Sequence, residues 1–185
     1  MYGITELKKD VLITQAGVPY RVIESTHTQL GRGGAVVRAK LKNLLDGTVV
    51  TRTFKGNDKV ESAQVDRVPL QYLYAEPAAV IFMDTQSYDQ LPVAKSLVAD
   101  QLAYLPEGAI ATGLRFQGRI VGLELPVKVE LKVTQSEPGV RGDTSGTALK
   151  PATLETGFVI KVPLFIKPGD LIRVDTRDGS YVERV

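Results

Sequence analysis

The residues with the clearest chemical potential form a glycine-rich segment that carries a single cation, Gly31-Arg32-Gly33-Gly34. Glycine permits φ angles above zero and close backbone approach, so this segment predicts a narrow hairpin tip. Arg32 is its only long side chain, and a guanidinium offers five hydrogen-bond donors and a permanent charge. The segment therefore predicts one cation that is presented to a partner.

Basic residues continue downstream of this tip with the period of a β-strand. Arg38, Lys40 and Lys42 alternate with apolar residues. Successive cations on one face of a strand lie about 6.6 Å apart, which suits a phosphate backbone better than a point ligand. No carboxylate occurs between Glu24 and Asp46, so we expect nothing local to neutralise this face. A solubility face or a protected sheet edge is the alternative interpretation.

A second candidate is a polar, glycine-punctuated segment near the C-terminal third of the chain. Its residues of interest are Arg141, Gly142, Asp143, Thr144, Ser145 and Gly146. The Asp-Thr-Ser-Gly run resembles an aspartic-protease turn, but that chemistry needs two facing carboxylates and the chain has one such motif. Ser145 has no partner base, because the one histidine, His27, lies far away in the chain. We expect a surface loop, and the functional alternative is a loop that grips ribose or phosphate.

The composition excludes several kinds of site. The 185 residues include no cysteine and one histidine, so we expect no thiol nucleophile and no metal site. Lys and Arg total 23 against 21 Asp and Glu, and the net charge of +2 excludes polyanion binding through overall basicity. No apolar run has the length of a signal peptide core or a membrane span. We therefore expect a cytoplasmic protein that holds no cofactor.

Strands must position these residues. Turn signals recur about every 8–12 residues, a spacing typical of all-β barrels or sandwiches. Strands are expected over 11–15 and 20–24, and then over 35–45 and 48–54 around an Asp46-Gly47 hairpin turn. One short helix is expected over 96–105, ended by Pro106, with Val98, Leu102 and Leu105 on one face.

Three small β-barrels are the most economical division of this all-β chain, with boundaries after residues 64 and 127. Residues 1–64 hold ten basic and six acidic side chains, a net +4. Residues 65–127 hold four and seven, a net −3, and residues 128–185 hold nine and eight, a net +1. The first module is therefore the one expected to touch phosphate.

Aromatic residues divide into two groups. Six in apolar, strand-like contexts are expected in the core rather than as base-stacking platforms: Tyr72, Tyr74, Phe82, Tyr88, Phe158 and Phe165. Tyr181 lies among polar residues close to Arg184, and these two are weaker candidates for an RNA contact.

The chain resembles the bacterial elongation factor P family from end to end. The motifs that carry the resemblance are Gly31-Arg32-Gly33-Gly34-Ala35, Lys40-Leu41-Lys42-Asn43-Leu44, Gln71-Tyr72-Leu73-Tyr74, Val80-Ile81-Phe82-Met83-Asp84, Pro138-Gly139-Val140-Arg141-Gly142-Asp143-Thr144-Ser145-Gly146 and Lys150-Pro151-Ala152-Thr153-Leu154-Glu155-Thr156-Gly157. The resemblance implies an N-terminal SH3/KOW-like barrel over 1–64 and two OB-fold barrels over 65–127 and 128–185, in an L-shaped, tRNA-like arrangement.

The resemblance also implies a function. It indicates a non-enzymatic translation factor that enters the 70S ribosome between the peptidyl and exit sites when consecutive prolines stall synthesis. Its expected partners are the ribosome, ribosomal RNA and peptidyl-tRNA, whose CCA end it positions. We expect a monomer with no membrane partner. The competing hypothesis is a stand-alone RNA-binding or RNA-chaperone protein built on OB-like barrels. An enzyme built on Asp143 ranks last.

By resemblance, the candidate residues take separate roles. Arg32 at the tip contacts the peptidyl-tRNA end, the row Arg38, Lys40 and Lys42 grips the tRNA backbone, and the loop 141–146 contacts small-subunit or exit-site RNA. Many family members carry a modified lysine at the tip, and some carry a rhamnosylated arginine. Lysine-directed modification cannot occur at Arg32, and we expect a bare arginine there. An enzyme that modifies Arg32 is the alternative partner.

Overall fold

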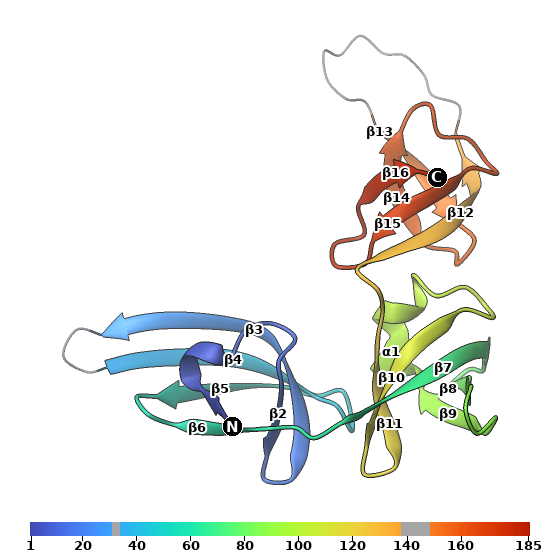
Figure 1. The fold of residues 1–185 in the computed structure, drawn as a ribbon. Helices are drawn as coiled ribbons and strands as arrows, with labels where there is room; N and C mark the ends of the chain where they lie inside the picture. The colour runs from blue at the N-terminus through green and yellow to red at the C-terminus, as the bar shows by residue number, and fades with distance from the viewer. Residues whose placement is uncertain (31–33, 138–148) are drawn as a thin grey trace. The chain divides into compact units, whose positions relative to one another are not determined.

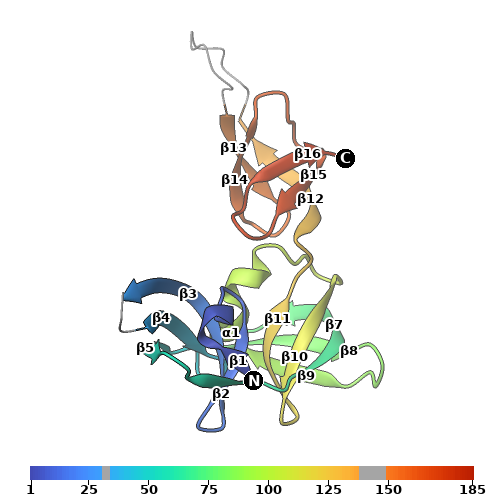
Figure 2. The same ribbon diagram turned by 60° about the vertical axis from the view of Figure 1, so that its left-hand side comes forward.

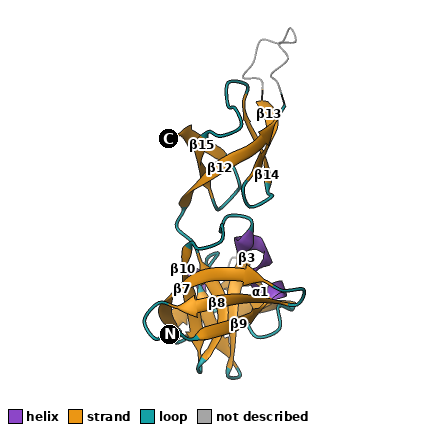
Figure 3. Ribbon diagram, turned by 90° about the vertical axis from the view of Figure 1, so that its right-hand side faces the viewer, coloured by secondary structure: helices purple, strands orange, loops and turns teal. Residues whose placement is uncertain are grey.

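The computed structural model describes residues 1–30, 34–137 and 149–185. Strands dominate these residues, alongside one short α-helix and a 3-10 turn, η1 (Ile4–Glu6) (Figure 3). The all-β fold class expected from the turn spacing is confirmed, since the strands form three sheets. No helix in the described part of the chain is long and apolar enough to cross a membrane.

The N-terminal sheet has the strand order β1-β6-β2-β3-β4-β5, and all its pairings are antiparallel (Figure 1). Its strands are β1 (Tyr2–Gly3), β2 (Leu12–Gln15), β3 (Val18–Leu30), β4 (Gly34–Asn43), β5 (Val49–Lys55) and β6 (Lys59–Ser62). Side chains from these strands, among them Ile13, Val22 and Leu41, form a buried core. Because inward and outward side chains alternate along a strand, burying this row leaves the opposite row in solvent.

The turn between β2 and β3 is tighter than the sequence predicted. Ala16 and Gly17 alone make the turn, with φ of 50° and 78°, the backbone of a two-residue hairpin connection. Pro19 therefore lies inside β3, paired with Thr14, instead of in the turn. Its carbonyl oxygen still accepts a hydrogen bond from the amide of Leu44, at 3.0 Å.

The middle sheet has the order β11-β10-β7-β8-β9. Its strands are β7 (Asp66–Ala75), β8 (Ala79–Asp84), β9 (Gln90–Ala94), β10 (Ile110–Phe116) and β11 (Arg119–Glu124). Strand β10 approaches β7 closely at Gly113, where an added Cβ would lie 2.4 Å from Leu70 Cδ1. Only glycine permits this approach without displacing a fully buried leucine.

The expected helix is present but shorter. Helix α1 (Lys95–Leu102) ends before Leu105, and the chain continues with a turn bond from the Tyr104 amide to the Gln101 carbonyl oxygen. A proline disfavours helical backbone at the residue before it, so Pro106 excludes Leu105 from the helix. Val98 and Leu105 are nevertheless both buried, because the apolar side chain after the helix end still reaches the protein interior.

The C-terminal sheet has the order β14-β13-β12-β15-β16, again with antiparallel pairings (Figure 2). Its strands are β12 (Lys128–Ser136), β13 (Leu149–Leu154), β14 (Val159–Pro163), β15 (Leu171–Asp175) and β16 (Tyr181–Arg184). Leu131, Leu154 and Ile172 belong to its buried core. The described residues divide into two compact units. The first comprises Met1–Arg67 with Leu114–Gly122, and the second comprises Val68–Gly113 with Leu123–Val185.

Three of the six aromatic residues expected in the core are buried or packed against it. Tyr72 and Phe82 are buried, and Phe158 packs against the C-terminal core. The expectation is wrong for the other three, since Tyr74 is 45% exposed, Phe165 57% and Tyr88 71%.

Each error has a structural cause. Strand β7 has a register shift between Tyr72 and Tyr74, so the second tyrosine turns to the opposite face of the sheet. Phe165 lies beyond the end of β14, and Tyr88 lies in the loop between β8 and β9. Neither of these two residues belongs to a strand that would point it inward.

Candidate nucleic-acid interface

The hairpin of β3 and β4 carries the basic row. The two strands pair from Tyr20 opposite Asn43 to Leu30 opposite Gly34, and β5 flanks β4 on its other side (Figure 1). Arg38 and Lys40 are exposed and Lys42 is half-buried, whereas the three apolar residues between and before them are fully buried. The predicted alternation is therefore present in the strand.

Hydroxyl groups lie on either side of the basic row. Thr26 on β3 and Thr53 on β5 are the cross-strand partners of Arg38, and Thr51 is the partner of Lys40. A shallow hollow of about 290 Å³ lies on this face, lined by Glu24, Thr26, Arg38, Lys40 and Thr51. Cations flanked by hydroxyl donors suit phosphate oxygens, which accept hydrogen bonds from both.

The expectation that nothing local neutralises this row is wrong. The Lys40 Nζ lies 2.5 Å from the Glu24 Oε2, and both side chains are more than half exposed. A β-bulge causes this contact, because the register shifts between Val22 and Glu24. The one extra residue on β3, Ile23, moves Glu24 onto the outward face directly opposite Lys40.

Arg38 is the cation of the row whose charge is locally uncompensated. It has no salt bridge or hydrogen bond to another side chain in the part of the chain that the structure describes. Lys42 does have an interaction, and Lys40 is paired. The cationic character of the face is therefore strongest at Arg38, on the tip side of the row.

The predicted tip falls on the connection between β3 and β4. Gly31, Arg32 and Gly33 lie outside the described residues, and Gly34 begins β4 opposite Leu30. The two strands thus lead the backbone to both sides of this segment, and the role of Arg32 stays a prediction.

The second predicted segment, Arg141 to Gly146, also lies outside the described residues. The residues that flank it are tied together, because the buried Lys150 donates from its Nζ to the Glu137 carbonyl oxygen at 2.7 Å. Lys150 is only 8% exposed, and this hydrogen bond pairs its buried ammonium group. Its role is therefore structural, because it connects the end of β12 to β13.

The two weaker C-terminal candidates are used mainly within the protein. The Tyr181 ring packs against the C-terminal core. The Arg184 guanidinium lies 5.8 Å from the centroid of the Phe165 ring and 3.9 Å from an oxygen of Asp170. The structure therefore explains both residues without RNA, although Arg184 remains about half exposed.

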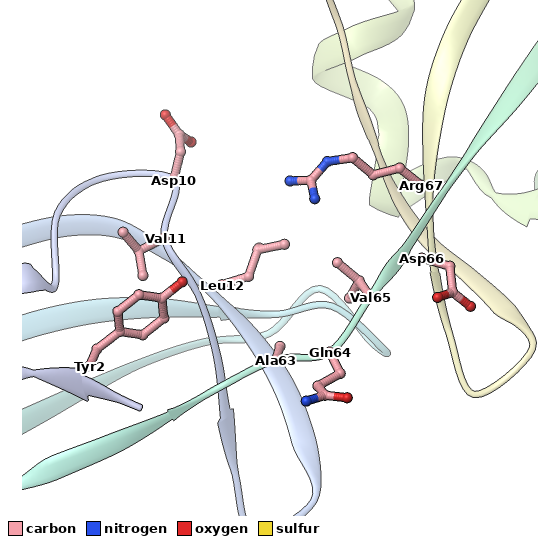
Figure 4. A pocket seen from close by; sticks show the side chains of 9 residues that line it. All are labelled: Tyr2, Asp10, Val11, Leu12, Ala63, Gln64, Val65, Asp66 and Arg67. Carbon is pink, nitrogen blue, oxygen red and sulfur yellow. The ribbon is translucent and has the colours of Figure 1, made fainter.

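A separate polar pocket of about 430 Å³ lies in the first compact unit (Figure 4). It is lined by Tyr2, Asp10, Val11, Leu12, Ala63, Gln64, Val65, Asp66 and Arg67. The Arg67 side chain extends toward the pocket, while the carboxylates of Asp10 and Asp66 point away from one another (Figure 4). No group of acidic or histidine side chains among the described residues could hold a metal ion.

Sequence reasoning missed the partners of the basic row. Glu24, Thr51 and Thr53 belong to the same outward face, but they lie on β3 and β5, whereas the alternating cations lie on β4 alone. The alternating threonines after the Asp46-Gly47 turn were the available signal, because a hairpin turn fixes which residues of the two strands face each other.

Comparisons with known proteins cover the whole chain. Three family models match in succession: "Elongation factor P (EF-P) KOW-like domain" over 4–60, "Elongation factor P (EF-P) OB domain" over 65–123 and "Elongation factor P, C-terminal" over 129–184. The chain is 43% identical to elongation factor P of Coprothermobacter proteolyticus over 185 residues, which is all of both proteins. It is 44% identical to that of Aquifex aeolicus over 98% of this chain and 95% of the relative.

A solved structure of eukaryotic translation initiation factor 5A from Methanococcus jannaschii also aligns with this chain. The alignment has a TM-score of 0.45 and 20% identity, and it covers 66% of this chain and 94% of the other.

Proposed function

Because this chain belongs to the elongation factor P family of translation factors, we propose that it binds the 70S ribosome between the peptidyl and exit tRNA sites. There it stimulates peptide-bond formation at consecutive prolines by positioning the CCA end of peptidyl-tRNA. The observation that carries this proposal is the β3–β4 hairpin, whose outward cations lead toward the segment that contains Arg32.

Positioning is enough to accelerate this reaction. Proline is a poor acceptor and donor, because its ring fixes φ and its nitrogen is a secondary amine. Holding the peptidyl-tRNA end in a reactive geometry supplies entropy in advance, and each ~1.4 kcal/mol gained is a tenfold faster step. In this proposal no side chain of the factor exchanges a bond or a proton, and the ribosome remains the catalyst.

The end and the outward face of the hairpin contact different parts of the tRNA in this proposal. Arg32 donates charged hydrogen bonds to the tRNA end as a bare arginine, each contributing roughly 1.5–3 kcal/mol. Arg38, Lys40 and Lys42 follow the backbone, and Thr26, directly opposite Arg38 on β3, adds a hydroxyl donor. The intact mass of the purified protein distinguishes a bare Arg32 from one decorated by a modifying enzyme.

The loop Arg141 to Gly146 makes the second RNA contact in this proposal, with small-subunit or exit-site RNA. Its backbone N–H groups and the hydroxyls of Thr144 and Ser145 grip phosphate or ribose, and Asp143 is not a catalytic group. Arg184 is a further RNA contact in this proposal, and Tyr181, whose ring packs against the C-terminal core, is a weaker one.

A reconstituted translation assay with a Pro-Pro-Pro reporter tests the function. We expect the purified chain to increase full-length product and to sediment with 70S ribosomes that carry initiator tRNA. Equal or tighter binding to free single-stranded RNA, with no effect on the reporter, would instead indicate a stand-alone RNA-binding protein.

A further inference from the structure

One hairpin loop in each sheet is built on the same hydrogen-bond frame. The three loops span residues 43–48, 84–89 and 175–180. In each loop the first amide donates to the last carbonyl oxygen, and the fifth amide donates to the first carbonyl oxygen, all at 2.8–2.9 Å. The three loops therefore have the same backbone hydrogen bonds.

Side chains complete the frame in the same way. The first residue of each loop, an Asn or Asp, accepts from the amide of the third residue at 2.8–2.9 Å. The fourth residue accepts from the amide of the sixth, through Asp46 and Asp178 at 2.9 Å and through Ser87 at 3.3 Å. Nearly the same hydrogen bonds stabilise all three loops. A difference between their exposed residues therefore points to a role outside the loop itself.

The fifth position is the difference. It has a positive φ in all three loops, 78° at Gly47, 74° at Gly179 and 63° at Tyr88. Glycine adopts this backbone freely, whereas a bulky side chain is strained there. Burial does not offset the strain, because Tyr88 is 71% exposed. An exposed aromatic ring held where glycine would be easier indicates a contact with a partner.

The surroundings of Tyr88 indicate the chemistry of that partner. Strands β8 and β9, which carry the loop, lie in a segment over 68–94 that has no basic side chain and three carboxylates, of which Asp84 is buried. One of these, Asp89, is exposed and follows Tyr88 directly. Such a surface repels phosphate, which argues against base stacking on RNA. It attracts arginine, whose guanidinium stacks on a tyrosine ring and pairs with a carboxylate.

We propose that Tyr88 and Asp89 form a docking point for an arginine-bearing protein surface of the ribosome. This inference rests on the proposed function, which identifies the ribosome as the particle that this protein binds. The Tyr88 ring stacks on one guanidinium, and Asp89 pairs with the same cation or its neighbour. The loop frame fixes the backbone that carries the ring before binding, so little backbone freedom is lost in the complex.

The first experiment replaces Tyr88 with glycine, the residue that the other two loops have at this position. Tyr88→Gly should unfold at the parent's melting temperature or up to about 4 °C above it, because strain is removed. Its Kd for 70S ribosomes with initiator tRNA should rise about fivefold, and Asp89→Asn should weaken binding similarly. Tyr88→Phe and Gln86→Ala, a change in the same loop, should bind like the parent. A clear loss of stability in Tyr88→Gly, or an unchanged Kd, would overturn the proposal.

The second experiment identifies the partner. A photoreactive benzoylphenylalanine in place of Tyr88 should crosslink to a basic ribosomal protein in the 70S complex, whereas the same probe in place of Leu45 should not give this product. A crosslink to ribosomal RNA or tRNA, or no crosslink from a bound factor, would refute the protein partner. If the parent chain itself fails to bind 70S ribosomes, both the proposed function and the docking point are refuted. If the parent binds and Tyr88→Gly binds equally well, only the docking point is refuted.

Discussion

The cations of the N-terminal hairpin and those of the C-terminal barrel are used differently. On β15, Arg173 donates hydrogen bonds to Glu130 on β12, at 2.8 Å, and to Glu183 on β16. These partners raise the pKa of Arg173 above its ordinary value. On β4, Arg38 has threonines as both cross-strand neighbours, and Lys40 faces the carboxylate of Glu24. Arg173 is therefore paired within the protein, whereas Arg38 is available to a partner.

Strand register produces this difference. Arg173 is directly opposite both Glu130 and Glu183, so three strands form a row of alternating charge. The two regions have similar numbers of basic residues, ten in 1–64 and nine in 128–185. Basic content therefore does not tell which cations are available, and the identity of the cross-strand neighbours does.

The largest expected effect contrasts two arginines. Arg32→Ala should reduce Pro-Pro-Pro rescue by tenfold or more and leave thermal stability unchanged, because a hairpin tip makes few packed contacts. Arg32→Lys should restore part of the activity. Arg173→Ala is the matched control, which should lower the melting temperature by a few degrees and keep rescue intact. Normal rescue by Arg32→Ala would remove this residue from the mechanism.

Next in size is the loss of the basic row. A variant with Arg38, Lys40 and Lys42 all changed to Gln should bind tRNA-loaded ribosomes about tenfold more weakly, which corresponds to about 1.4 kcal/mol. Its affinity should also depend less on salt, because fewer counterions are released. Filter binding at low and moderate salt measures both. Arg52→Gln, on the neighbouring strand, is the control. Parent-like affinity at both salt concentrations would make the row a solubility face.

A smaller effect is expected from the second predicted RNA contact. Changing Asp143 and Thr144 together to Ala should speed dissociation from stalled ribosomes a few-fold, while the rate of peptide-bond formation at saturating factor stays normal. Pre-steady-state kinetics and dissociation rates test this division of labour. A slowed chemical step with unchanged dissociation would reverse the roles of the two ends.

A change in the opposite direction sharpens the comparison further. Glu24→Gln removes the carboxylate that pairs with Lys40, so it should tighten ribosome binding about twofold at low salt. The gain should disappear in the double variant with Lys40→Gln. Weaker binding by Glu24→Gln alone would show that Glu24 orients Lys40 instead of competing with the RNA.

The smallest effect concerns the acid stability of the C-terminal barrel. Hydrogen bonds from the side chain and amide of Arg177 lower the pKa of Asp175 from 3.8 to about 2. A lowered native pKa contributes stability above the unfolded value, and that stability is lost as the pH falls from about 4 toward 2. Arg177→Ala should therefore reduce the melting temperature at pH 5 and flatten its decline in acid. An unchanged profile between pH 5 and 2 would contradict this pairing.

The sequence by itself was sufficient to predict the all-β class, the β4 alternation and the family. These depend on local information: turn residues recur at short spacing, and side chains alternate along one strand whatever its neighbours are. The outward position of Arg38 could be predicted for that reason, and so could the burial of Ala39 next to it.

Only the tertiary structure decided which side chains face each other where the register of a strand shifts. The pairing of Glu24 with Lys40 depends on a bulge at Ile23, and the exposure of Tyr74 depends on another register shift in β7. The strain at Tyr88 becomes visible only beside the two loops that place glycine at the same position. A one-residue shift between strands reverses which face a side chain occupies, and the packing of the whole sheet selects the register.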